Sequence, residues 1–262
     1  MIGEIGTWAD RLEAVIAETP NGLLDRVRVV ARTKSTQDAA RDAAGGRPGL
    51  VLVAGRQTGG RGRLGRTWLD DGGHGLAMSI TVDARAVDDL FSIRVGLGAS
   101  LACEAALGTQ CRLRWPNDVL EPGRGGRKLA GVLVEVRDSL AVVGIGINIL
   151  QSAWPEGLGE RAVSLAQLGF VGSRLDVACF FLRAFAAAME MSAKTALALW
   201  LEREWLVGRR CALVIGTRRI VGRVEGITAS GTLAVVHDDG RVEHLDPALV
   251  SIDHEASVGA PR

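Results

Sequence analysis

Four strand-like segments joined by short turns lie within residues 112–149, and they restrict the possible folds more than any other feature of the chain. The segments are 112–115, 118–121, 129–136 and 140–149, and the residues between them are rich in Gly, Pro, Asn and Asp. Antiparallel strands can be joined by a short turn, whereas a parallel connection needs a long crossover. We therefore expect these segments to form neighbouring antiparallel strands.

The patterns around this region predict an α+β fold. Apolar residues recur at helical spacing from Ile2 to Ile16, and a Pro-Asn-Gly turn ends that pattern. Ser35 is expected to be the N-cap of a helix that reaches about Ala44. The other expected elements are strands over 27–31, 50–54 and 75–83 and helices over 88–107, 174–191 and 194–206.

The pattern changes at Gly208, where short strand-like segments begin to alternate with turn sequences such as TASG and HDDG. These segments cover about 210–215, 219–226, 232–236 and 241–245. We interpret them as a small β-barrel. The chain is accordingly divided into a main domain over 1–206, a barrel domain over 207–254 and a tail over 255–262.

The composition argues against several classes of protein. The net charge is +1, whereas proteins that bind nucleic acid usually have a strong basic excess. The four cysteines form no CxxC pair and the four histidines show no metal-ligand spacing, so we expect reduced thiols, a cytoplasmic location and no dedicated metal site. No apolar run reaches the roughly 18 residues of a membrane span, and the acidic N-terminus does not resemble a signal peptide.

The segment GRQTGGRGRLGRTW, residues 55–68, contains five glycines and four arginines. Its composition fits a surface loop, an RGG-like nucleic-acid contact or an anion-binding loop that folds over its ligand. Glycine lets backbone N–H groups turn inward, and arginine supplies a forked, permanently charged donor. The net charge and the absence of aromatic residues before Trp68 weigh against nucleic acid, and the P-loop pattern is missing. The segment alone does not decide between these functions.

Five motifs occur in order along the chain, and together they resemble the biotin–protein ligase family. They are KSTQDAA (34–40), QTGGRGRLGRTW (57–68), RWPNDVL (114–120), RKLAGVLVEV (127–136) and GIGINI (144–149). The resemblance implies a class II synthetase-like ligase domain followed by an SH3-like barrel. It also implies that biotin and ATP form biotinyl-5′-AMP, from which biotin passes to a carrier lysine. Such an adenylate hydrolyses easily, so we expect residues 57–68, the Arg/Gly loop, to close over it.

By this resemblance, the Arg/Gly loop supplies much of the binding site. The residues that match contacts to biotin or the adenylate are Gln57, Gly60, Arg61, Arg63 and Trp68, and those that match contacts to the nucleotide are Arg63, Arg66 and Trp68. Two plainer interpretations stay open, since Arg66 could be a surface charge and Trp68 a core residue.

Two further motifs supply polar residues by the same resemblance. Ser35 and Thr36 match contacts to the biotin head, where a helix N-terminus also offers free N–H groups, and the chain has Gln37 where the family usually has Asn. Asn117 and Asp118 match roles near ATP, Mg²⁺ or the incoming lysine, which a carboxylate could orient or deprotonate. A plain hairpin turn is the alternative for this pair.

Arg114 stands where the family usually has Lys, so the charge is kept but the geometry is not. Lys128 matches a residue that reaches the biotin carboxylate and the α-phosphate, and the alternative is a solvated surface lysine. We expect Gly131 on the same side of the strand, where it lets the ligand approach the backbone. Asn148 matches a nucleotide-binding residue, or else an amide that caps the strand end. The predicted catalytic residues are Lys128, Arg61 and Asp118.

The predicted function is ATP-dependent biotinylation of a carrier lysine, with ATP and biotin as substrates and Mg²⁺ as cofactor. The expected partner is the biotin carboxyl carrier domain of a biotin-dependent carboxylase, with no DNA or membrane partner and with homodimer formation left open. About 26 residues precede the first predicted core strand, too few for the winged-helix domain of some family members. A lipoate- or octanoate-transferring relative and a non-catalytic ligand- or RNA-binding protein are the alternatives, which the GRGR and KLAG motifs and Lys128 disfavour.

Overall fold

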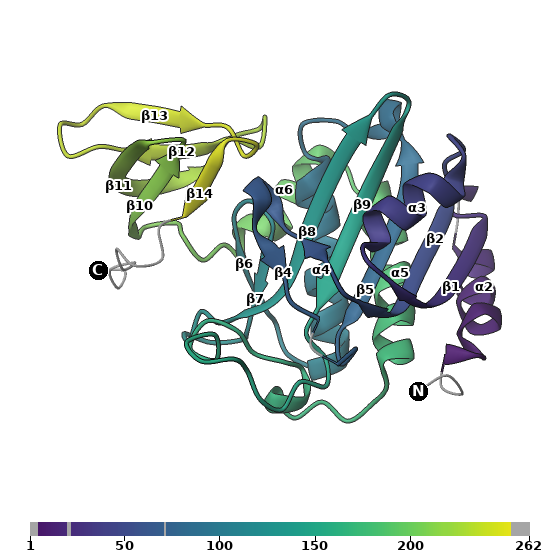
Figure 1. Cartoon of the computed structure of the whole chain (residues 1–262). Helices are drawn as coiled ribbons and strands as arrows, with labels where there is room; N and C mark the ends of the chain where they lie inside the picture. The colour runs from purple at the N-terminus through teal and green to yellow at the C-terminus, as the bar shows by residue number, and fades with distance from the viewer. Residues whose placement is uncertain (1–4, 20–21, 71, 253–262) are drawn as a thin grey trace.

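A seven-stranded mixed sheet forms the centre of the larger part of the molecule (Figure 1). The computed structural model describes residues 5–19, 22–70 and 72–252. The strand order is β1-β2-β5-β9-β8-β7-β6. The strands are β1 (Arg26–Thr33), β2 (Leu50–Gln57), β5 (Leu76–Asp83), β6 (Arg112–Arg114), β7 (Asp118–Leu120), β8 (Lys128–Arg137) and β9 (Leu140–Ile147).

Only β1 and β2 pair in parallel within this sheet, and every other neighbouring pair is antiparallel. The predicted antiparallel arrangement of residues 112–149 is therefore confirmed. The parallel pair needs a crossover, which α3 (Thr36–Ala44) provides. α3 lies against β2, β5 and β9, and the backbone N of Thr36 at its N-terminus donates a hydrogen bond to Gln57, the last residue of β2.

Helices cover both faces of the sheet (Figure 1). α4 (Phe91–Leu107) and α5 (Arg174–Glu190) pack together on the face opposite α3, and α2 (Trp8–Glu18) packs against β1 and α5. Large side chains fill this layer, including the fully buried Trp8, Trp200 and Phe185. The predicted α+β class is confirmed. Among the described residues, no helix is long and apolar enough to cross a bilayer.

Helix α6 (Ala193–Leu201) is shorter than the helix expected over 194–206. The chain leaves the helix because the next residues bind elsewhere. Arg203 forms an ion pair with Glu104 of α4 at 2.8 Å, and buried Glu204 accepts hydrogen bonds from the backbone N–H groups of Trp115 and Leu206. These contacts replace the last predicted helical turn.

A second sheet of five strands follows, in the order β13-β12-β11-β10-β14. Its strands are β10 (Arg210–Ile215), β11 (Arg218–Ile227), β12 (Leu233–Val236), β13 (Val242–Leu245) and β14 (Val250–Ile252). The first four were predicted, but β14 was missed because three residues are too short to show a periodicity. Among the described strands, β13 and β14 do not pair, so a closed barrel is not shown. The division of the chain at residue 207 stays a prediction, and the tail over 255–262 lies outside the described residues.

Candidate functional site

Two adjoining cavities open on the sheet face that carries α3. The inner cavity has a volume of about 150 Å³ and lies between β8, β9, the start of α3 and the Arg/Gly loop. The outer cavity, of about 680 Å³, extends toward residues 154–162. Arg66, Trp68, Asp118 and Lys128 line both cavities, so they mark the boundary between the two.

The inner end of the site is built around the N-terminus of α3. Oε1 of Gln57 accepts hydrogen bonds from the backbone N of Thr36 at 2.8 Å and from its Oγ1 at 3.1 Å. Ser79 donates to Oγ1 of Thr36 at 2.9 Å. Ser35 does occupy the N-cap position, but its side chain makes no capping bond, and its buried Oγ has no partner among the described residues. Gln57 thus binds the N–H group of Thr36, the first residue of the helix, which lies before the N–H groups that a capping side chain usually binds.

The Arg/Gly loop is folded as a small hairpin over the inner cavity. Its strands are β3 (Gly60–Arg61) and β4 (Thr67–Trp68), which pair with each other. Gly60 is required here, because a Cβ atom would lie 2.5 Å from Nε2 of Gln57 and 2.6 Å from the carbonyl oxygen of Trp68. The ring of Trp68 lies against Gly146 of β9 in the same way, since a Cβ there would lie 2.3 Å from the indole.

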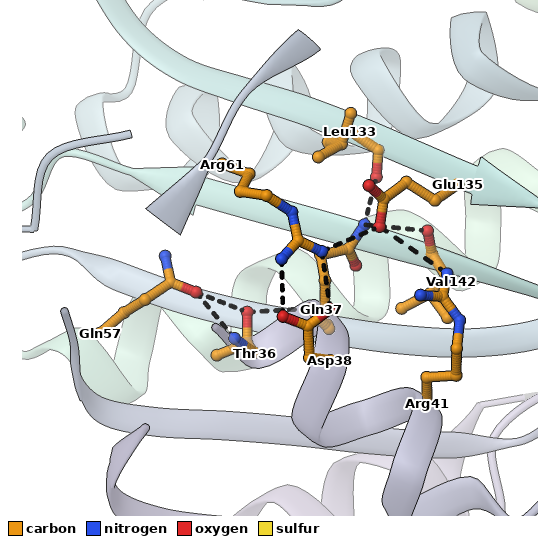
Figure 2. A network of polar contacts seen from close by, with 10 residues as sticks. Thr36, Gln37, Asp38, Arg41, Gln57, Arg61, Leu133, Glu135 and Val142 are labelled. Atoms are coloured by element: carbon orange, nitrogen blue, oxygen red, sulfur yellow. Dashed lines mark hydrogen bonds and ion pairs between the residues drawn. The ribbon is translucent and has the colours of Figure 1, made fainter. Parts of the chain in front are cut away.

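Arg61 holds this hairpin to α3 and β8 (Figure 2). Its guanidinium binds both carboxylate oxygens of Asp38, at 2.6 and 2.8 Å, and reaches Glu135 at 3.4 Å. The hydrogen bonds from Arg61 lower the pKa of Asp38 and, in return, Asp38 raises the pKa of Arg61. Glu135 was missed in the sequence, although it lies on the same strand as Gly131 at an even spacing and so shares its face.

Arg63 connects the hairpin to the second sheet. Its Nη2 donates to the carbonyl oxygens of Pro247 and Val250, the latter at 3.2 Å, and its Nη1 lies 3.4 Å from Oδ1 of Asn117. Burial lowers the pKa of Arg63, although the nearby carboxylates oppose this effect. Asn117 also donates from Nδ2 to the carbonyl oxygen of Val132 at 2.6 Å. No sequence motif had indicated that residues 250–252 line the site.

Asp118 is the electrostatic centre of the boundary between the cavities. Lys128 binds its Oδ1 at 2.6 Å, and Arg114 binds its Oδ2 at 2.7 Å. Burial alone would raise the pKa of Asp118, but the two cations outweigh burial and hold it well below the usual range. Lys128 also lies over the Trp68 ring, 5.3 Å from its centroid. Arg114, for which the sequence led us to expect a change of geometry, forms an ion pair with Asp118.

Lys128 and Gly131 lie on one side of β8, although a spacing of three residues would put them on opposite faces of a regular strand. A β-bulge explains this arrangement, because β7 pairs with Ala130 and then with Lys128, so that Leu129 is skipped. A Cβ at Gly131 would lie 2.9 Å from Nζ of Lys128 and 3.2 Å from Trp68. The expected shared side is present, and the bulge is its cause.

The structure places the predicted residues in three groups. Ten line the inner cavity: Thr36, Gln57, Arg61, Arg63, Arg66, Trp68, Asn117, Asp118, Lys128 and Gly131. Asn148 lines only the outer cavity, and its Nδ2 donates to the carbonyl oxygens of Lys128 and Val163 at 3.2 Å each. Ser35 and Gly60 lie beneath the surface and line neither cavity. The outer cavity also contains Trp154 and Arg161, which the sequence motifs had not indicated.

Comparisons with known proteins extend these similarities over most of the chain. A family model described as the biotin/lipoate A/B protein ligase family matches residues 29–151. A biotin–[acetyl-CoA-carboxylase] ligase of Mycobacterium tuberculosis is 36% identical over 241 residues, covering 83% of this chain and 88% of that protein. The corresponding ligase of Paracoccus denitrificans is 31% identical, covering 81% of this chain and 95% of that protein. The structure of a biotin protein ligase from Aquifex aeolicus in complex with biotin and ATP matches with a TM-score of 0.76 and 28% identity, covering 87% of this chain and 98% of that one.

Proposed function

Since this chain belongs to the biotin/lipoate A/B protein ligase family, we propose that it is an ATP-dependent biotin–protein ligase. A carboxylate oxygen of biotin attacks the α-phosphorus of ATP, the bond to the β-phosphate oxygen breaks, and pyrophosphate leaves. The amine of a carrier lysine then attacks the carbonyl carbon of biotinyl-5′-AMP, AMP leaves, and the nitrogen loses a proton. The observation that carries this proposal is the position of Lys128 at the boundary of two joined cavities.

We assign biotin to the inner cavity and the nucleotide to the outer cavity. Thr36 and Gln57 form a buried polar end suited to the ureido ring, and Trp68 supplies an apolar wall. The biotin carboxylate then lies near Lys128, where the α-phosphate enters from the outer cavity. The ammonium group offsets the negative charge that gathers on both reacting groups.

Asp118 orients Lys128 in this proposal. Its lowered pKa keeps the carboxylate ionised at neutral pH, which makes it a weak base for the incoming lysine. The ion pairs with Lys128 and Arg114 fix the ammonium group instead. The sequence had suggested that Asp118 orients or deprotonates the incoming lysine, and we propose instead that it orients Lys128.

The phosphates of ATP, and not a cluster of side chains, would hold Mg²⁺ at this site. The described residues contain no group of three or more His, Cys, Asp or Glu side chains that could hold a metal ion, and both oxygens of Asp118 are in ion pairs. Mg²⁺ commonly keeps several waters and binds through substrate phosphates. Bound there, it would offset phosphate charge.

The protein partner that we propose is the biotin carboxyl carrier domain of a carboxylase, in line with the names of the two similar ligases. We propose no DNA partner, because the net charge of +1 gives little general attraction to phosphate backbones. Homodimer formation stays open.

The experiment that tests the function weighs an apo carrier domain after incubation with the protein, Mg²⁺ and ATP. One reaction contains biotin, a second lipoate, and a third omits ATP. We expect the mass of one biotinyl group in the first reaction alone. Addition of lipoyl would support the alternative transferase, and an unmodified carrier in all three would contradict the proposal.

A further inference from the structure

The half-buried carboxylate of Asp70 ties the two ends of the Arg/Gly loop together. Oδ2 of Asp70, two residues after β4, accepts a hydrogen bond from the backbone N of Gln57 at 2.7 Å. The two ends of the hairpin therefore meet at this contact between Asp70 and Gln57, which we call the clasp. Arg174 of α5 binds the same end of β2, because its Nη1 donates to the carbonyl oxygen of Gly55 at 2.8 Å.

Gln57 connects this clasp to the inner cavity. Its backbone is bound by Asp70, and its side chain binds the N-terminus of α3 through Thr36. Among the described residues, Asp70 lines neither cavity, whereas Gln57 lines the inner one. Any effect of Asp70 on the ligand must therefore pass through Gln57 and the hairpin.

We infer that Asp70 is a positioning residue, whose carboxylate fixes Gln57 and thereby the biotin-head end of the inner cavity. This inference rests on the proposed function, since it assigns that end of the cavity to biotin. It adds a residue that lies in none of the five motifs.

The electrostatics of Asp70 agree with a role in positioning rather than in stability. Burial raises its pKa, although the backbone amides of Gln57 and Gly75 and the charge of Arg174 oppose this. An acid whose pKa is higher in the folded protein favours folding when protonated, so its ionised form at neutral pH lowers stability. Loss of this charge should therefore cost little stability, while loss of the hydrogen bond frees Gln57.

The test compares Asp70→Ala, Asp70→Asn, Asp70→Glu and the exposed control Glu13→Ala. We expect Asp70→Ala to raise the KM for biotin about tenfold, the order of one lost hydrogen bond, with kcat and the KM for ATP near wild type. Asp70→Asn keeps an oxygen acceptor, so its KM should stay within about threefold of wild type. Asp70→Glu keeps the charge but displaces the carboxylate, so its KM should also rise.

Amide hydrogen exchange at Gln57 in the ligand-free protein gives a readout independent of catalysis. We expect faster exchange in Asp70→Ala and Asp70→Glu, and wild-type exchange in Glu13→Ala. The inference is overturned if folded Asp70→Ala, or Asp70→Glu should the alanine variant not fold, keeps wild-type exchange and a wild-type KM. The inference would also be overturned if Asp70→Ala lowered both the melting temperature and kcat but left the KM for biotin unchanged. If the wild type released no pyrophosphate with biotin, the proposed function would fail. Amide hydrogen exchange at Gln57 would still test whether Asp70 fixes this residue.

Discussion

Lys128 is the residue on which the chemistry of the site depends most. It contacts Asp118 at 2.6 Å and lies over Trp68, and these neighbours hold its ammonium group at the boundary of the two cavities. Two reacting anions, a carboxylate and a phosphate, meet there in the proposed reaction. A fixed cation stabilises the transition state more at such a point than it would in water, because the surrounding protein does not have to reorganise.

We predict that Lys128→Ala lowers biotin-dependent pyrophosphate release by about 10²–10³-fold, the usual cost of one such donor. Synthetic biotinyl-AMP should restore much of the transfer to the carrier, because that half-reaction begins after adenylation. Lys194→Ala, on the exposed face of α6, is the matched control and should leave both steps unchanged. Pyrophosphate release near the wild-type rate in Lys128→Ala would remove the catalytic role of Lys128.

The role of a single residue was predictable where the residue belongs to a motif. It was not predictable where contacts between distant segments determine its partner. The motifs indicated Lys128, Asp118 and Thr36, all of which line the inner cavity. They gave no sign of Glu135 as a partner of Arg61, because an ion pair between residues 74 positions apart depends on the folded sheet. The free Oγ of Ser35 was equally hidden, since the N-cap position alone does not show whether the side chain makes a capping bond.

The hairpin β3–β4 lines the inner cavity, and we predict that it acts as a lid there. Its latch between Arg61 and Asp38 is bidentate, yet the side chains are 39% and 51% exposed. Exposed ion pairs contribute only about 0–1 kcal/mol. A latch of this strength can hold the hairpin closed and still let it open for each substrate.

We predict that ligand slows amide exchange over residues 57–67, and that Arg61→Gly or Asp38→Ala reduces this protection. Both variants remove the latch, and a glycine-rich segment loses about 1–2 kcal/mol per residue in entropy when it becomes ordered. The measurement is hydrogen exchange with and without a non-hydrolysable biotinyl-AMP analogue. Asp42→Ala, exposed on the same helix, is the control. Equal exchange with and without the analogue in the wild type would contradict the idea of a lid.

Elements were predicted well where periodicity is long and less well where the chain deviates from it. The strands of the central sheet follow clear apolar patterns, but β2 continues to Gln57, beyond its predicted end at residue 54, because its polar end pairs with β1. The bulge at Leu129 was not predictable from alternation, and it places Lys128 beside Gly131. Three-residue β14 carried no pattern at all.

At the scale of the whole molecule, the second sheet closes one side of the site. Arg63 binds carbonyl oxygens at residues 247 and 250, and the indole of Trp115 donates to the carbonyl oxygen of Gly231 at 2.9 Å. Glu204 lies behind Trp115, where it also accepts a hydrogen bond from Trp200. These contacts connect α6 and the RWPND segment to the second sheet.

We predict that this junction makes stability depend on pH. Burial raises the pKa of Glu204 to about 7, whereas the ordinary value is 4.5, so the folded protein favours its protonated form. Protonated Glu204 contributes roughly 1–3 kcal/mol to the free energy of unfolding. This contribution is complete below about pH 4.5 and is lost as the pH rises through about 7. Glu204→Gln should flatten this slope in urea unfolding at several pH values. An unchanged slope would show that Glu204 does not titrate in this range.

In the function that we propose, one pair of joined cavities forms biotinyl-5′-AMP and then delivers it to the carrier. The most direct measurement mixes the wild-type protein with ATP, Mg²⁺ and biotin, without a carrier, and quantifies pyrophosphate and protein-bound biotinyl-AMP. We predict about one adenylate per site at the end of a single turnover, and its loss to the carrier lysine when an apo carrier domain is added. No biotin-dependent pyrophosphate, or an adenylate that the carrier cannot discharge, would contradict the account.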